Sequence, residues 1–185
     1  MEDPTNNPLV WLDMEMTGLE PLTCVPLQMA VVITDSELEE LDSHEVTLWQ
    51  PEEVLSRMDP FVRKMHTENG LLDRVRASDV GMLQAEREIM ARVSRYCPFG
   101  AGILAGNSIH TDRAFLKAYF PTLHGYLHYR MVDVSSLKEL VRRWYGRDWL
   151  FIKQLQKHTA LEDVRESIAE LRHYRLTCMR SPNKS

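Results

Sequence analysis

The most informative stretch of the sequence is Trp11-Leu12-Asp13-Met14-Glu15-Met16-Thr17-Gly18-Leu19, in which two acids stand at the end of an apolar run. Residues 9–14 predict a buried β-strand. Side chains alternate along a strand, so Asp13 and Glu15 point to the same side. Neighbouring carboxylates repel each other, and at a buried strand end they are costly unless a cation neutralises them. The pattern favours a metal site, with a solvated strand end as the alternative.

The hydrophobic pattern on either side of this stretch predicts an α/β fold. Further strands are expected at residues 27–34, 46–49, 103–105 and 131–134. Helical spacing marks residues 80–97, 111–119, 136–144 and 159–174. The first three strands lie close in sequence and predict an antiparallel meander, so the whole order indicates a mixed sheet with packed helices. We expect one domain over residues 8–175, with flexible termini at 1–7 and 176–185.

Two further acids occur at positions where ligands are common. Asp112 follows the 103–105 strand and opens a helix, although an acid there also suits the helix dipole. Asp163 lies about one turn into the last helix, with His158 just before it. Those two residues converge on one site only if His158 stands outside the helix. The alternative is an exposed histidine beside an ordinary helix-surface acid.

The order of these elements resembles the DEDD exonuclease superfamily, in its variant with a histidine five residues before the last acid. Longer strings resemble its oligoribonuclease family: the 11–19 stretch, Gly106-Asn107-Ser108, His128-Tyr129-Arg130, residues 133–140 and residues 158–167. The similarity runs from about residue 8 to 175. It implies a ribonuclease H-like mixed five-stranded sheet flanked by helices. It also implies a homodimer that acts on short RNA oligonucleotides and dinucleotides.

The resemblance also implies a site. Two divalent ions, Mg²⁺ or Mn²⁺, would be held by four acids: Asp13, Glu15, Asp112 and Asp163. Oxygen ligands suit both metals. His158 would be the general base, and the product a nucleoside 5′-monophosphate. Six residues would contact substrate: Leu19, His66, Ser108, Tyr129, Arg130 and Ser135.

Two segments depart from the family pattern. Gln28 stands where the family usually has an acid, and Pro26 removes a donor from the second strand. We expect Gln28 not to ligate metal but to weaken support around the ligands. Residues 151–157 replace a stretch that is often rich in proline and lysine, which affects the pose of His158.

Composition narrows the function classes. The 185-residue chain has a net charge of −5 and no basic run, which argues against a protein that grips long nucleic acid. No apolar run reaches the roughly 20 residues of a membrane span, so no membrane partner is expected. Three widely spaced cysteines indicate reduced thiols and a cytoplasmic protein. A proofreading-like DNA exonuclease and an inactive nucleic-acid-binding module stay open as alternatives. So do the choice of metal and a signalling dinucleotide as main substrate.

Overall fold

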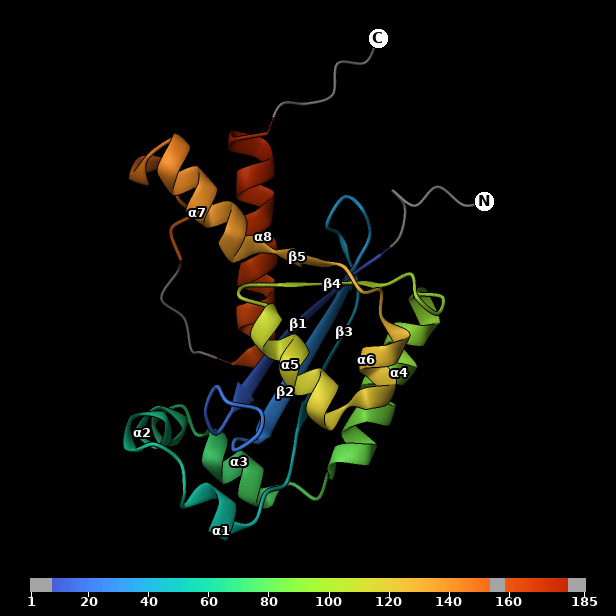
Figure 1. Cartoon of the computed structure of the whole chain (residues 1–185), viewed down its shortest axis with the longest axis vertical. Coiled ribbons are helices and arrows are strands. Elements are labelled where there is room, and N and C mark those ends of the chain that lie inside the picture. The colour runs from blue at the N-terminus through green and yellow to red at the C-terminus, as the bar shows by residue number, and fades with distance from the viewer. Residues whose placement is uncertain (1–7, 154–158, 180–185) are drawn as a thin grey trace.

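Five strands form one mixed sheet in the order β3-β2-β1-β4-β5 in the computed structural model, which describes residues 8–153 and 159–179 (Figure 1). The strands are β1 (Leu9–Met16), β2 (Pro26–Thr34), β3 (Glu40–Thr47), β4 (Ile103–Gly106) and β5 (Met131–Asp133). The pairs β1–β2 and β2–β3 are antiparallel, which confirms the predicted meander. β4 pairs in parallel with both β1 and β5. The mixed five-stranded sheet expected from the sequence is therefore confirmed.

Helices cover both faces of this sheet. Along the described chain they are α1 (Glu52–Leu55), α2 (Pro60–Glu68), α3 (Leu71–Ala77), α4 (Met82–Tyr96), α5 (His110–Tyr119), α6 (Pro121–Tyr126), α7 (Val134–Trp144), the 3₁₀ turn η2 (Arg147–Trp149) and α8 (Ala160–Thr177). α4, α5 and α6 share a core with one face, and α7 and α8 share a core with the other. The short helices α1 to α3 enclose a separate small core at one end of the sheet (Figure 1).

Alternation along β1 decides which way the acids face. Val10, Leu12 and Met14 are buried in the core shared with α4, α5 and α6. Trp11 is buried in the opposite core, against α7 and α8, and its indole nitrogen donates to Thr34 Oγ1 at 3.0 Å. The period of two continues after Trp11, so the two acids of β1 emerge on the side of α8.

Several element bounds differ from the sequence prediction. β1 extends to Met16, so both acids lie within the strand. β3 begins at Glu40, although its first six residues are largely polar, because charged residues are tolerated on an edge strand. α7 begins at Val134, two residues early, because the Asp133 carboxylate caps it. α8 extends to Thr177, so 176–177 are helical rather than part of a flexible terminus. Residues 1–7 and 180–185 lie outside the described part.

The region between β3 and α4 contains three helices that the hydrophobic pattern did not resolve. Each is short, with nine residues or fewer, so an apolar stripe has little length over which to repeat. A capping signal was nevertheless present for α2. Asp59 accepts from the backbone N–H of Phe61 at 2.8 Å, and Pro60 occupies the first helical position.

Gly106 ends β4 where the backbone passes close to β1. A Cβ at this position would lie 2.8 Å from the Leu12 carbonyl oxygen and 3.0 Å from Ile109 Cδ1. The first of these is a backbone atom of the central strand, which can move only at a large cost in free energy. Glycine is therefore required where the chain turns from β4 towards α5.

Among the helices of the described residues, none combines the length and the apolar character that a membrane span requires.

We predict that Gly106→Ala lowers the free energy of unfolding by about 1–3 kcal/mol, the usual cost of overpacking. The melting temperature should fall by roughly 2–10 °C for a chain of this size. Gly125→Ala in α6 is the matched control, because its Cβ would meet nothing within 4 Å. Thermal denaturation of both variants checks this. Equal melting temperatures would contradict the close approach at Gly106.

Candidate active site

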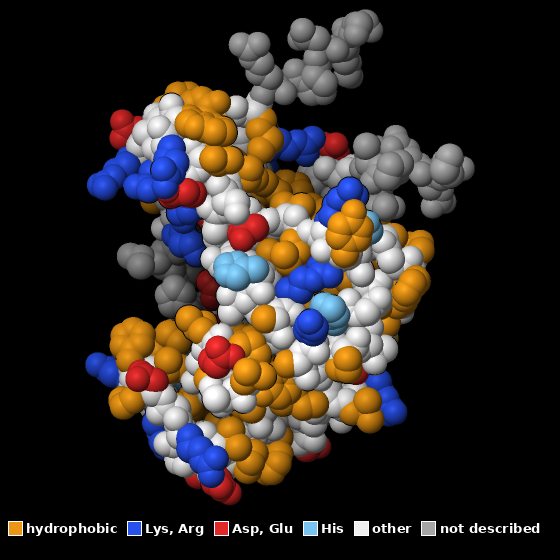
Figure 2. Space-filling model, viewed as in Figure 1, with side chains coloured by type: hydrophobic (Ala, Val, Ile, Leu, Met, Phe, Trp, Pro, Cys, Tyr) orange, Lys and Arg blue, Asp and Glu red, His pale blue; other side chains and the backbone are white. Residues whose placement is uncertain are grey.

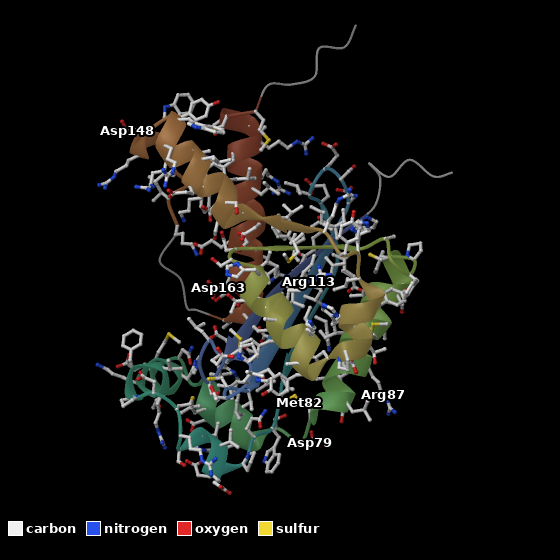
Figure 3. All side chains as sticks on the ribbon, in the orientation of Figure 1. Asp79, Met82, Arg87, Arg113, Asp148 and Asp163 are labelled. Atoms are coloured by element: carbon white, nitrogen blue, oxygen red, sulfur yellow. The ribbon has the colours of Figure 1, made fainter. Side chains whose placement is uncertain are left out.

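Three carboxylates converge at the end of β1. Asp13 and Glu15 come from the strand and Asp163 from the first turn of α8. One potential ligand atom from each lies within 4.8 Å of the other two. Asp163 is labelled in Figure 3, near the end of α8 that approaches the sheet. The grouping predicted from D-x-E and the last helix is therefore present in the fold, and all three side chains are partly exposed.

Asp112 lies beside this group but is not one of its three members. Its side chain is buried, and its Oδ1 accepts a hydrogen bond from the backbone N–H of Met14 at 3.0 Å. Met14 stands between the two strand acids, so this bond ties α5 to β1 at the site itself. The charge of Asp112 lies close enough to Asp13 to raise the pKa of that residue. Asp112 therefore does more than interact with the dipole of α5, because its hydrogen bond joins that helix to β1.

The crowding of these acids raises their pKa values. Burial raises the pKa of Asp13 well above its usual range, and the charges of Asp112, Glu15 and Asp163 raise it further. Burial likewise raises the pKa of Asp112 to about 7, although its hydrogen bonds, including that from Met14, oppose the shift. Without a cation the site therefore retains protons near neutral pH. Bound positive charge would release them.

A carboxylate from β3 fixes the start of α8. Thr159 is the N-cap, and its hydroxyl oxygen accepts from the N–H of Glu162. Glu45 Oε2 accepts from the N–H of Leu161 at 3.1 Å, so an acid from the sheet satisfies a second free amide of this helix end. These contacts set where Asp163 lies. His158, the expected general base, lies outside the described residues.

Lys153 is a cation at the site that the sequence pattern did not single out. Its Nζ lies 2.8 Å from Glu166 Oε2, and Glu166 follows Asp163 by one turn of α8. The positive charge of Lys153 lowers the pKa of Asp13, against the stronger effect of burial. It therefore offsets part of the negative charge of the acids. A lone lysine in an irregular segment gives no sequence signal of this kind.

Two buried neutral side chains flank Glu15. His66 is fully buried, its Nε2 donates to the Met16 carbonyl at 3.0 Å, and its Nδ1 lies 3.9 Å from Glu15 Oε2. Gln28 pairs with Glu15 across the sheet, and its Nε2 donates to Thr47 Oγ1 at 2.9 Å. Burial lowers the pKa of His66, which favours the neutral imidazole. In this structure His66 therefore supports the end of β1 from the protein interior, through its hydrogen bond to Met16.

Ser108 and Ser135, expected to contact substrate, meet where β4 and β5 end. The Ser108 N–H donates to Asp133 Oδ1 and to Ser135 Oγ, each at 3.0 Å. The Ser135 N–H also donates to Asp133 Oδ1, at 2.9 Å, and its hydroxyl donates to Asn107 Oδ1. The backbone amides of this turn are thus already used by a carboxylate. A substrate phosphate would have to be met by the side-chain hydroxyls.

The segment carrying Tyr129 and Arg130 holds its side chains outward. The Tyr129 ring is 71% exposed, stacks on His128 at 4.5 Å, and lies 5.1 Å from the Arg130 guanidinium. Arg113, labelled in Figure 3, fixes the backbone beneath by donating to the His128 and Arg130 carbonyl oxygens. The backbone is therefore held while an aromatic ring and a cation project from the surface.

Apolar side chains are exposed on the two segments that follow and flank the end of β1. Leu19 is 77% exposed in the loop after the strand, and Phe61 is 76% exposed on α2, the helix that also carries His66. Orange side chains gather over this end of the molecule in Figure 2. Exposed apolar and aromatic surfaces are suited to nucleobases. The sequence pointed to Leu19 through the family resemblance. The exposure of Phe61 is not evident from the hydrophobic pattern.

Comparison with known proteins shows which family the chain belongs to. The exonuclease family RNase T matches residues 10–171. The chain belongs to this exonuclease family. Among its relatives, the oligoribonuclease of Pseudomonas paraeruginosa PA7 is 46% identical over 176 residues, covering 95% of this chain and 97% of the relative. The oligoribonuclease of Shewanella loihica PV-4 is 48% identical over 174 residues, covering 94% and 95%. The resemblance expected from the sequence is confirmed.

Solved structures agree on the fold. Exonuclease I of E. coli, in complex with a 5cy-dT13 oligonucleotide, superposes with a TM-score of 0.72 at 16% identity over 94% of this chain. Exonuclease I of Methylocaldum szegediense gives a TM-score of 0.69 at 21% identity over 93%. This chain spans 41% of the length of each of those two chains. At such identities the likeness to exonuclease I establishes a shared fold alone.

The donor set of the exonuclease site fits a divalent metal. Every candidate ligand is a carboxylate oxygen, and three come from within 4.8 Å of one another. Hard oxygen ligands of this kind suit Mg²⁺ or Mn²⁺ rather than metals that prefer nitrogen or sulfur. The raised pKa values of Asp13 and Asp112 point the same way, because such crowding is relieved when a cation binds.

We predict that Asp112→Asn stabilises the metal-free protein, by an amount that grows as pH rises from 5 to about 7 and then levels off. An acid whose folded-state pKa is raised holds a proton that the unfolded chain has released, so wild-type stability falls with rising pH between about 4 and 7. Asparagine keeps the acceptor for Met14 without this loss. The gain in melting temperature in chelator should reach roughly 5–15 °C at pH 8.

Asp35→Asn is the control for that measurement, because Asp35 also accepts backbone N–H groups, those of Glu37 and Glu39, but in a surface turn. Adding Mn²⁺ should raise the melting temperature of the wild type and of this control, and far less that of Asp112→Asn. A gain that stays constant between pH 5 and 8 would contradict the assignment of a raised pKa to Asp112.

Proposed function

We propose that this exonuclease degrades very short RNA, including dinucleotides, from the 3′ end to nucleoside 5′-monophosphates. One observation carries the proposal: Asp13, Glu15 and Asp163 converge in a chain whose relatives at 46–48% identity, over nearly their full length, are oligoribonucleases. The buried Asp112 beside them completes the four acids expected for this family. The free cysteines of the described chain accord with a cytoplasmic enzyme.

We assign the metal site to two divalent ions, Mg²⁺ or Mn²⁺, held by the four acids. When bound, such ions neutralise charge on the phosphate and lower the pKa of a water. Asp13 lies on the central strand, the charges of the other three acids all act on it, and the family resemblance makes it the candidate for a shared ligand. Its position is fixed by the sheet, while Asp112 and Asp163 are brought to it by α5 and α8.

The remaining roles fall to side chains around the acids. His158 is the candidate general base that takes a proton from the attacking water, since its unperturbed pKa of about 6.5 suits this work near neutrality. Leu19, which is exposed, would insert at the terminal bases. Ser108 would offer its hydroxyl to a phosphate of the substrate, and Ser135 would do so by exchanging its bond to Asn107. His66 would support Glu15 from the protein interior, because its ring is fully buried.

The preference for short RNA follows from the modest supply of positive charge. The chain carries a net charge of −5, and acidic and basic side chains are interspersed on the face shown in Figure 2. Affinity for long nucleic acid comes mainly from phosphate contacts along a basic surface. A dinucleotide offers few phosphates and needs few cations. Arg130, exposed beside Tyr129, would supply one for the 5′-phosphate.

We further propose that the enzyme acts as a homodimer. The 128–130 backbone is fixed by Arg113, yet Tyr129 and Arg130 project away from the surface of their own subunit. An exposed tyrosine and arginine on a rigid backbone are typical of residues that dock on a partner. In a symmetric dimer each subunit would complete the site of the other.

Digestion of labelled RNAs of two to ten nucleotides tests the main proposal. We predict that turnover is fastest on dinucleotides, is lost in chelator, and falls by roughly a thousand-fold or more in Asp13→Asn, since metal binding supplies several kcal/mol to catalysis. Asp148→Asn, which removes an acid from the 3₁₀ turn η2, should retain wild-type activity.

A DNA 20-mer and the same RNA set distinguish the alternatives. Faster cleavage of the DNA than of the dinucleotide would favour a proofreading-like DNA exonuclease. Binding of RNA without cleavage at any metal concentration would favour an inactive nucleic-acid-binding module. Full activity in excess chelator would overturn the metal mechanism.

Subunit mixing tests the homodimer. Asp13→Asn removes a metal ligand, and Tyr129→Ala removes a ring whose stacking on a base is worth roughly 1–3 kcal/mol. If Tyr129 acts in the partner's site, a mixed dimer contains one site with neither defect. We predict that the mixture exceeds the summed activity of the two variants after subunit exchange. Exchange without such a gain would show that Tyr129 acts in its own subunit or not at all.

A further inference from the structure

The loop that follows β1, residues 17–25, is closed upon itself. At its base the Thr17 N–H donates to the Val25 carbonyl at 3.0 Å, and the Val25 N–H donates back to Thr17 Oγ1 at 2.9 Å. Nearer its tip the Cys24 N–H donates to the Glu20 carbonyl at 2.8 Å. Leu19 stands exposed on this loop. The loop thus has a defined shape, but these bonds do not fix its direction relative to the carboxylates.

Tyr119 anchors the loop from outside. Its hydroxyl is shared between two loop carbonyl oxygens, that of Cys24 at 2.7 Å and that of Pro21 at 3.1 Å. The ring lies on the last turn of α5 and stacks on Phe115 of the same helix, with centroids 6.0 Å apart. The anchor is therefore a polar group at the end of a ring that its own helix holds in place.

The same helix also carries Asp112. The two residues are seven positions apart, which is close to two turns, so they lie on one face of α5. Asp112 bonds to the backbone of β1 within the acidic site, and Tyr119 bonds to the loop that β1 leads into. One rigid helix therefore spans the two parts. It sets the distance between the acids and the exposed leucine.

The loop is also packed closely within itself, beside a carbonyl that Tyr119 holds. A Cβ on Gly18, the residue before Leu19, would lie 2.6 Å from Cys24 Sγ. Cys24 is one of the two residues whose carbonyl accepts from Tyr119. A shift of Cys24 is therefore transmitted directly to Gly18 and to its neighbour. Loss of the anchor would free the tip of the loop while leaving its hydrogen-bonded base in place.

We propose that Tyr119 is a positioning residue for substrate binding: its hydroxyl holds the 17–25 loop so that Leu19 meets the terminal bases at a fixed place relative to the acids. The inference rests on the proposed function, because it requires that Leu19 contacts substrate. Tyr119 itself touches no reacting atom. Its effect belongs to binding rather than to the chemical step.

Tyr119→Phe is the direct test, because it keeps the ring and removes the hydroxyl alone. Loss of one such hydrogen bond should raise KM for a dinucleotide by roughly three- to ten-fold and leave kcat within about two-fold. Tyr126→Phe is the matched control, since its hydroxyl donates to the Cys97 carbonyl at 2.8 Å, away from the loop. It should leave KM unchanged. Hydrogen exchange should quicken at the Cys24 amide in the first variant only.

A double-mutant cycle with Leu19→Ala separates the possible failures. If Tyr119 acts through Leu19, Tyr119→Phe should add little to KM once Leu19 is gone. A wild-type KM in Leu19→Ala would overturn the proposed contact of Leu19 with substrate, whatever Tyr119 does. A raised KM in Leu19→Ala, together with no effect or a fully additive effect of Tyr119→Phe, would overturn the positioning role alone. The exchange measurement reports on the anchor independently of activity.

Discussion

Repulsion among carboxylates at the end of β1 is the constraint around which the other elements are arranged. Asp13 and Glu15 are forced onto one side by the strand period, and Asp163 is brought against them. The fold offsets this in several ways. Asp112 accepts a backbone N–H from the strand itself, Lys153 stands close enough to lower the pKa of Asp13, and Glu45 accepts from the Leu161 N–H of α8. The negative charge that these contacts leave uncompensated favours the binding of cations.

α5 links the parts of the site that come from distant places in the chain. Asp112 fixes the helix to β1, Arg113 holds the carbonyls on either side of Tyr129, and Tyr119 holds the loop that carries Leu19. A candidate metal ligand and two candidate substrate contacts thus take their positions from ten residues of helix. Side chains that grip backbone carbonyls from a helix leave the substrate-facing side chains free. This division explains how exposed residues can be well placed without packing of their own.

The sequence predicted the centre of this arrangement and missed its supports. The D-x-E strand follows from local periodicity and the meander from three strands close in sequence, and both were confirmed. The approach of Asp163 to that strand was implied by the family resemblance, and the three carboxylates do lie close together. The supports depend on pairs far apart in the chain, such as Glu45 with Leu161 and Tyr119 with Cys24. No local pattern reports such pairs. The short helices before α4 escaped for a different reason, because their apolar stripes are too short to repeat.

The clustered carboxylates come from segments about 150 residues apart in the chain, which bears on the order of its synthesis. Asp13 and Glu15 leave the ribosome first, while Asp163 follows only when α8 is made. Until then Trp11, Ala30 and Val32 lack the helix that covers them. A nascent or prematurely ended chain therefore has neither a closed core nor a complete ligand set. A chain assembled in this way brings its three clustered carboxylates together only once α8 has been made.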